Sequence, residues 1–168
     1  MPRMRTVAAT TATMALLAVP GIADASLTAT QRAERKMTAA INSVRAQNGL
    51  PAFERSASLT GSAERYSRWL METDTFGHQS SIQASSRFAL LGEALAMHTG
   101  SSRFKVWWTV RRWLGSPSHR DILLSPVMRR QGAGVTRGRF GSSRAVVWVL
   151  HVGRLSLPGT QLPHVGLP

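Results

Sequence analysis

The sequence predicts an α+β fold, with helices in the first two thirds of the chain and strands near its end. Two segments of the first half place apolar residues at the spacing of an amphipathic helix. A later stretch, 145–152, is continuously apolar and rich in β-branched residues, as is typical of a strand buried on both faces. Helices and strands do not alternate, which argues against a βαβ fold. Helices are therefore expected to cover both faces of the sheet.

The first helix is predicted over residues 31–47, where apolar and charged positions fall on separate faces and an Asn-Gly pair follows. A second helix is predicted to begin after Ser56 or Ser58 as N-cap and to end before Asp74. Each helix offers one apolar face, so we expect both to pack on a shared core.

The middle of the chain, residues 77–103, is rich in serine and glycine and is predicted to be mainly loop with one or two short helical turns. Helical periodicity returns over residues 104–114 and ends at a Ser-Pro pair. A further short helix is predicted from Ser118 to Leu124.

Two strands, 136–140 and 145–152, are predicted to form a β-hairpin around a Gly-Ser-Ser turn. Residues 156–168 are rich in proline and show no periodicity, so we expect a loose C-terminal tail.

Residues 1–25 have the features of a secretory signal peptide: two arginines, an apolar run from Val7 to Val19 and a small-residue motif ending at Ala25. The run is interrupted by threonines and is shorter than the roughly 20 residues of a membrane-spanning helix, so no permanent transmembrane anchor is predicted. Its removal leaves 168 − 25 = 143 residues, enough for one domain over residues 26–155. We expect the protein to be secreted or periplasmic. The absence of cysteine excludes disulfides and a cysteine nucleophile.

The chain is strongly basic, with a formal net charge of +13. Without residues 1–25, which carry two basic residues and one acidic residue, the balance is 19 − 7 = +12. Such a chain is attracted to polyanions, and an exported protein meets anionic lipid head groups and envelope polymers. Nucleic acid is not the expected partner, because the arginines are scattered along the chain. The alternative is that the arginine content reflects coding bias on a solvated surface.

Familiar catalytic motifs are absent from the sequence, which has no P-loop, dinucleotide-binding fingerprint, nucleophile elbow or metalloprotease helix motif. Glu93 is the one carboxylate in the middle section of the chain, and its nearest partners in sequence are Glu72 and Asp74 at a predicted helix end. A glycosidase needs two carboxylates at one bond, so this activity is disfavoured.

The histidines are the remaining candidates for chemistry. His78 and His119 lie at borders between helix and loop, where functional groups tend to be displayed. His98 falls in a predicted polar loop, His151 is expected to be a hydrogen-bonded core residue, and His164 lies in the tail. Four tryptophans are expected to belong to the core, because they follow helical or strand periodicity: Trp107, Trp108, Trp113 and Trp148.

Five segments of the sequence carry a resemblance to a known family. They are INSVRAQNGLPAF (41–53), LTGSAERYSRWLMETDTFGH (59–78), GEALA (92–96), WLGSPSHRDILL (113–124) and GAGV (132–135). Their order and spacing resemble those of the CAP superfamily, also called SCP-like extracellular proteins, and in particular its compact bacterial branch. The resemblance implies a three-layer α-β-α sandwich.

The resemblance also implies that His78, Glu93 and His119 line one open cleft. His78 matches the first histidine of the family, Glu93 the glutamate of its G-E-N element, and His119 the histidine of its bacterial S-x-x-H-R element. Two positions depart from the pattern. Ser116 stands where many members have a second glutamate, and Ala94 stands where they have asparagine.

Arg120, next to His119, is expected at the first turn of a short helix, where its charge opposes the helix dipole. This mismatch suggests a partner for Arg120: Asp121, Glu93 or an anionic ligand. Ser116 and Arg120 are therefore candidate ligand-binding residues.

Two imidazoles and one carboxylate suit Zn²⁺, and three protein ligands with an open fourth position are typical of a catalytic zinc site. If Glu93 ligates the metal, no second carboxylate lies nearby as general base. If Glu93 is the base, only two protein ligands remain. A third possibility is that the three groups hydrogen-bond one another and fix the loops of the cleft.

Two functions therefore compete. One is a secreted binding module for an envelope lipid or cell-wall polymer, with or without a divalent metal. The alternative is a metal-assisted hydrolase acting on peptide or envelope substrates. We favour the binding module, which is not an enzyme, because the family's second glutamate is absent at Ser116.

Overall fold

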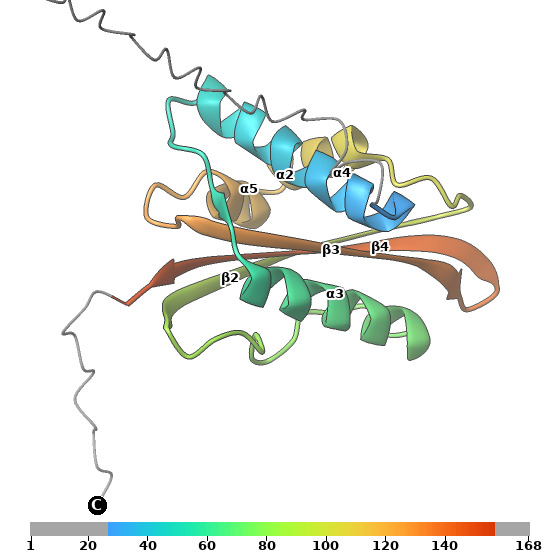
Figure 1. Ribbon diagram of the computed structural model, residues 1–168. Coiled ribbons are helices and arrows are strands. Elements are labelled where there is room, and N and C mark those ends of the chain that lie inside the picture. The colour runs from blue at the N-terminus through green and yellow to red at the C-terminus, as the bar shows by residue number, and fades with distance from the viewer. Residues whose placement is uncertain (1–26, 157–168) are drawn as a thin grey trace, which may run out of the picture.

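Four strands form a single mixed sheet that lies between two layers of helices (Figure 1). The computed structural model describes residues 27–156, so the predicted signal peptide and the tail beyond Ser156 lie outside the described residues. The elements are, in chain order, α2 (Ala29–Gln47), β1 (Glu54–Arg55), α3 (Ala57–Glu72), β2 (Phe88–Thr99), α4 (Val106–Leu114), α5 (Pro117–Leu123), β3 (Arg130–Phe140) and β4 (Ser143–Leu155). Helices α2, α4 and α5 cover one face of the sheet and α3 covers the other, which confirms the α-β-α sandwich.

The sheet has the strand order β1-β3-β4-β2. β3 and β4 form the predicted hairpin, and they pair antiparallel from Arg130 opposite Gly153 to Phe140 opposite Ser143. β2 pairs antiparallel with the other side of β4, and β1 adds a two-residue parallel pairing to β3. β4 is therefore a central strand and is buried on both faces, as its apolar sequence predicts.

Both predicted N-terminal helices are present, and their caps explain where they begin. The Thr28 hydroxyl accepts a hydrogen bond from Gln31 N at 3.1 Å, and the Gln31 side chain accepts one from Thr28 N at 2.9 Å, which makes a capping box. Of the two candidate caps of α3, Ser56 is the one in use, because its hydroxyl accepts from Leu59 N at 3.4 Å. The apolar buried residues of α2 follow the predicted helical period: Ala33, Met37, Ala40, Ile41 and Val44.

One prediction is wrong: residues 88–99 are not loop but strand β2, which pairs with β4 along its length. The composition of the segment misleads, because alanine, leucine and methionine favour helices and Thr99 is its one β-branched residue. Pairing with the buried central strand outweighs this local preference. The flanking residues 77–87 and 100–103 are irregular, as predicted.

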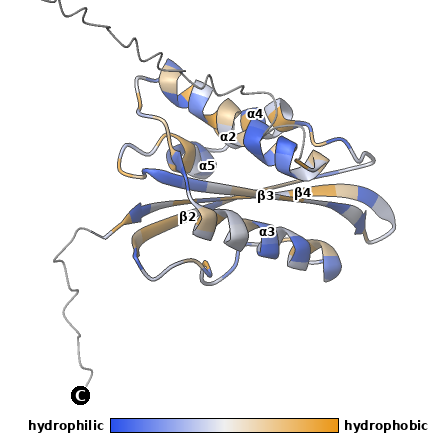
Figure 2. Ribbon diagram, viewed as in Figure 1, coloured by the Kyte–Doolittle hydropathy of each residue, from blue (hydrophilic) through white to orange (hydrophobic). Residues whose placement is uncertain are grey.

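Two apolar clusters fill the space between the layers, one on each face of the sheet. Met37 and Ile41 of α2 meet Trp113 and Trp148 in the larger cluster, whereas Leu70 belongs to the cluster under α3. Figure 2 shows hydrophobic colours on strand segments between the helix layers and hydrophilic colours at the turn of the hairpin. Among residues 27–156, no helix is both long enough and apolar enough to cross a bilayer.

Glycines of β3 allow α3 to lie directly on the sheet. A Cβ atom added to Gly132 would lie 2.0 Å from Thr60 N, and one added to Gly134 would lie 2.3 Å from Ala63 C. Any side chain at these two positions would push the helix away from the strand. The sequence GAGV thus has a packing role at this contact.

Candidate functional site

The fold brings His78, Glu93 and His119 to one cleft with a volume of about 480 Å³. His78 lies in the irregular segment after α3, Glu93 lies on β2, and His119 lies on α5. The ring centroids of the two histidines are 6.1 Å apart. Three side chains distant in sequence therefore meet, as the resemblance implies.

The Glu93 carboxylate is buried, and both of its oxygens are occupied by hydrogen bonds. Oε1 lies 2.8 Å from His78 Nδ1 and accepts from Gln79 N at 3.4 Å. Oε2 accepts from Gln79 Nε2 at 2.8 Å and lies 2.9 Å from His151 Nε2. Burial alone would raise the pKa of Glu93, but the hydrogen bonds from His151, Gln79 and His78 outweigh it and hold the pKa below its usual value. Glu93 is therefore an anchored carboxylate.

His78 is held from two sides and yet faces solvent. Its Nδ1 is bonded to Glu93, and the preceding residue, Gly77, accepts a hydrogen bond through its carbonyl from the Tyr66 hydroxyl at 2.6 Å. Because a carboxylate only accepts, Nδ1 is the nitrogen that donates to Glu93, and in a singly protonated ring Nε2 then keeps its lone pair. With 60% of the His78 side chain exposed, this ring is the accessible one beside Glu93.

His119 is presented by the first turn of α5. This helix begins at Pro117, one residue before the predicted start at Ser118, because proline suits the first helical position. Burial, and then the nearby His78, lower the pKa of His119, so its ring is neutral at pH 7. Leu123 anchors α5 in the core, and Ile122 packs beside it and lines the cleft.

A buried arginine of α2 fixes the end of α5. Arg45 Nη1 donates to Leu123 O at 2.8 Å and to Ser125 O at 3.0 Å, while Nε donates to Pro51 O at 2.9 Å. Its guanidinium carbon lies 3.6 Å from the centroid of the Phe53 ring. A cation at the carbonyl end of a helix is favourable, so Arg45 positions the helix that carries His119.

The two candidate ligand-binding residues have different surroundings. Ser116 is the N-cap residue of α5 and lines a second compartment that shares His119 with the cleft. Arg120 lines neither compartment, and within residues 27–156 no ion pair joins it to Asp121 or Glu93. Its expected partner is therefore not one of these two carboxylates in the described part of the chain.

Two residues of the site were not anticipated from the sequence: Gln79 and His151. His151 is fully buried on β4, directly opposite Glu93 on β2, and its Nε2 bonds the carboxylate. It is a core residue, as predicted, but it also supports the site. The strand pairing of β2 with β4 is the signal that identifies it, and a sequence pattern that predicts a loop over residues 88–99 does not contain this signal.

Two further predictions about individual residues are wrong. His98 is not in a polar loop but is buried on β2. Trp113 and Trp148 are core residues, as expected, whereas Trp107 and Trp108 are 50% and 38% exposed. Trp107 faces solvent, and Trp108 borders the second compartment together with Met97 of β2, so the core encloses neither ring.

Of the three cleft residues, two are imidazoles, and the one carboxylate, Glu93, has hydrogen-bond partners at both oxygens. Within residues 27–156, no group of three or more histidine, cysteine, aspartate or glutamate side chains is placed to hold a metal ion. The donor set fits a divalent metal held by His78 and His119, with Glu93 behind His78 as the carboxylate that orients it. It does not fit a three-ligand zinc site that includes Glu93, because both oxygens of Glu93 are already bonded.

Solved structures of similar fold come from bacteria and from a parasitic worm. An outer surface protein from Borrelia burgdorferi has 22% identity and a TM-score of 0.62, over 75% of this chain and 95% of that one. An extracellular SCP-domain protein from Bacillus anthracis has 18% identity and a TM-score of 0.61, over 82% of this chain and 45% of that one. Venom allergen-like protein 4 from Schistosoma mansoni has 11% identity and a TM-score of 0.59, over 78% of this chain and 92% of that one. At these identities the likeness shows the fold.

A family model described as the cysteine-rich secretory protein family, CAP, matches residues 38–152. No curated protein matches the chain. The matched range runs from α2 to β4 and includes every residue of the cleft described above.

Proposed function

The chain belongs to the cysteine-rich secretory protein (CAP) family, and from that premise we propose that it is a secreted binding module for an anionic envelope component. The ligand is a lipid or a cell-wall polymer, and it binds in the cleft between His78 and His119. The binding site is solvent-accessible at His78 and is bounded by apolar side chains such as Ile82, Leu91 and Ile122. This mixture is typical of ligand sites, in which a few polar groups orient a largely apolar contact.

The proposal rests on the hydrogen bonds and the lowered pKa of the Glu93 carboxylate. A metal-assisted hydrolase with this cleft would need a carboxylate that can take a proton from water. Glu93 accepts hydrogen bonds at both oxygens and has a lowered pKa, so it is a poor base. Ser116 stands where a second glutamate would be expected, so the cleft is better suited to holding a ligand than to activating water.

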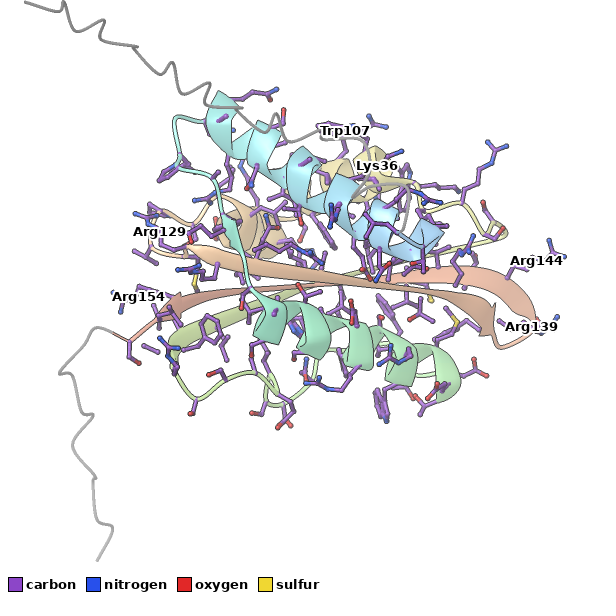
Figure 3. The ribbon with its side chains drawn as sticks, in the orientation of Figure 1. Lys36, Trp107, Arg129, Arg139, Arg144 and Arg154 are labelled. Atoms are coloured by element: carbon purple, nitrogen blue, oxygen red, sulfur yellow. The ribbon has the colours of Figure 1, made fainter. Side chains whose placement is uncertain are left out.

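The charge of the protein supports an anionic partner. The net charge is +13, and labelled arginines lie at both ends of the sheet, Arg129 and Arg154 at one end and Arg139 and Arg144 at the other (Figure 3). Similar structures come from proteins described as an outer surface protein and as an extracellular protein. Together with the signal-peptide pattern of residues 1–25, this supports export and an encounter with the envelope.

A divalent metal such as Zn²⁺ is part of the proposal, held by His78 and His119. When bound, such an ion supplies a Lewis-acidic centre with open positions for an anionic oxygen of the ligand. The chain's own contribution is to orient His78 through Glu93 and to keep His119 unprotonated near neutral pH.

Co-sedimentation of the purified protein with anionic lipid vesicles and with isolated cell-wall polymer tests the function. We expect binding to at least one of them, falling steeply as salt is raised, and weakened in the His78→Ala/His119→Ala double variant. The proposal would be contradicted if the protein did not bind at low salt, or if the double variant bound as well as the wild type. Hydrolysis of casein or peptidoglycan that disappears in Glu93→Gln would replace it with the metal-assisted hydrolase.

A further inference from the structure

A second compartment continues the cleft beyond His119. It has a volume of about 260 Å³ and shares His119 with the histidine compartment. Helix α4 contributes Trp108 and Arg112 to its wall, Phe76 comes from the segment after α3, and Met97 comes from β2. The hydrogen bonds of Glu93 use none of these four side chains.

Aromatic rings stand open to solvent in this compartment. Trp108 is 38% exposed and Phe76 is 43% exposed, although each has apolar neighbours. The buried His98 packs edge-on against Trp108, with ring centroids 5.6 Å apart and an interplanar angle of 81°. Burial lowers the pKa of His98, so this supporting ring is neutral at pH 7. Trp108 is therefore a flat apolar platform with a buried support.

Two cations flank the platform. The Arg112 guanidinium carbon lies 5.8 Å from the centroid of the Trp108 ring, and Lys105 Nζ lies 5.9 Å from it. Both distances are within the range of a cation–π contact. Within the described residues no aspartate or glutamate lines the compartment. The electrostatic potential of the two cations therefore favours a negatively charged group next to the Trp108 ring.

Resting on the function proposed above, we propose that this compartment binds a sugar ring of an anionic glycan strand. The apolar face of the sugar stacks on Trp108, and its carboxylate pairs with Arg112, which offers a planar fork of N–H donors. The strand then continues past Ser116 and His119 into the histidine compartment.

An acyl chain fits the compartment less well than a sugar does. A chain of methylene groups gains most from an enclosed apolar wall, whereas this wall is partly open and mixes aromatic faces with cationic and hydroxyl groups. A sugar ring has an apolar face and a polar edge, and this matches a flat indole with hydrogen-bond donors at its rim.

Calorimetric titration of the purified full chain tests the proposal with two matched probes. One is a hexasaccharide of alternating N-acetylglucosamine and N-acetylmuramic acid with free carboxylates, and the other is chitohexaose, which has the same backbone without carboxylates. We expect the anionic probe to bind about tenfold more tightly than the neutral one. Trp108→Ala and Arg112→Ala should each weaken it about tenfold, and Trp108→Phe, which keeps an aromatic face, should weaken it less.

Matched controls separate the site from general effects of charge and aromatic content. Trp107 neighbours Trp108 on α4 but does not line the compartment, and it lies on the outer side of the helix layer (Figure 3). Arg35 is an exposed arginine on α2 that lines neither compartment. Trp107→Ala and Arg35→Ala should leave the affinity for the anionic probe within about twofold.

Three results would overturn the inference: equal affinity for the two probes, unchanged affinity in Trp108→Ala and Arg112→Ala, or no binding of the anionic hexasaccharide. Phosphatidylglycerol vesicles, used as a third probe, distinguish failure of the glycan inference from failure of the proposed function. If the vesicles bind through His78 and His119 and the glycan does not, the proposed function stands and the glycan assignment is wrong. If neither the vesicles nor the anionic hexasaccharide binds, the proposed function and the glycan assignment are both wrong.

Discussion

Glu93 organises the candidate site at the scale of single residues, because four hydrogen bonds converge on its carboxylate. The consequence is a fixed tautomer for His78, whose Nδ1–H faces Glu93 and whose Nε2 is left for a ligand. His151 and Gln79 hold the opposite oxygen, so the carboxylate cannot turn away without breaking buried contacts.

Zinc binding is the first prediction at this scale. We expect isothermal titration calorimetry to show Zn²⁺ binding that is lost in His78→Ala and in His119→Ala, because each removes one of two imidazole donors. Glu93→Gln should weaken binding about tenfold through the orientation of His78. Ser118→Ala, which changes another residue of the cleft, is the control and should bind zinc normally. Unchanged affinity in both histidine variants would exclude the site.

Glu34 gives a pH-dependent prediction. It is buried on α2, its Oε1 accepts from Val135 N at 3.1 Å, and burial followed by the charge of Glu64 raises its pKa from 4.5 to about 7. Between these values the folded state holds a proton that the unfolded state has released. The raised pKa of Glu34 therefore contributes to the free energy of unfolding, and the contribution is fully present below pH 4.5. It is lost as the pH rises through 7, and the total loss is on the order of 3 kcal/mol.

Urea denaturation at pH 5 and pH 8 measures this effect. The wild type should lose stability between the two pH values, whereas Glu34→Gln, which cannot ionise, should lose much less. An equal loss in both proteins would show that Glu34 does not carry the pH dependence.

At the scale of elements, the close contact of α3 with β3 makes a second stability prediction. A methyl group on Gly134 would lie 2.3 Å from Ala63 C and Glu64 N, both of them backbone atoms that cannot rotate away. Gly134→Ala should therefore lower the free energy of unfolding by about 3 kcal/mol or more. Gly77→Ala is the matched control, since nothing lies within 4 Å of its added Cβ, and it should change stability by less than about 0.5 kcal/mol. Similar losses in both variants would contradict this account.

Elements also show where prediction from the sequence succeeds and fails. α2, α3 and the β3–β4 hairpin were predictable, because their apolar periodicity and turn residues agree with their final environment. β2 was not, because its alanine- and leucine-rich sequence becomes a strand only through pairing with β4. Without β2, nothing in the sequence places His151 opposite Glu93 or His98 beneath Trp108.

At the scale of the whole molecule, the family resemblance supplied what periodicity could not. His78, Glu93 and His119 are separated by segments of different structure, and no local pattern indicates that they meet. The resemblance placed them in one cleft, and the fold has that cleft. The neighbouring compartment with Trp108 and Arg112 was not predicted, because helical spacing alone suggested that Trp108 was buried.

The placement of Glu34 has a consequence for how copies of the protein behave toward one another. β1 pairs with only two residues of β3, so in the described part of the chain β3 has no strand neighbour on that side from Gly132 onward. Such an edge can recruit a strand from a second molecule and start aggregation. The Glu34 carboxyl occupies the Val135 N–H that an incoming strand would need. A buried acid on α2 thus fills one hydrogen-bonding position of this edge and makes the addition of a strand there less favourable.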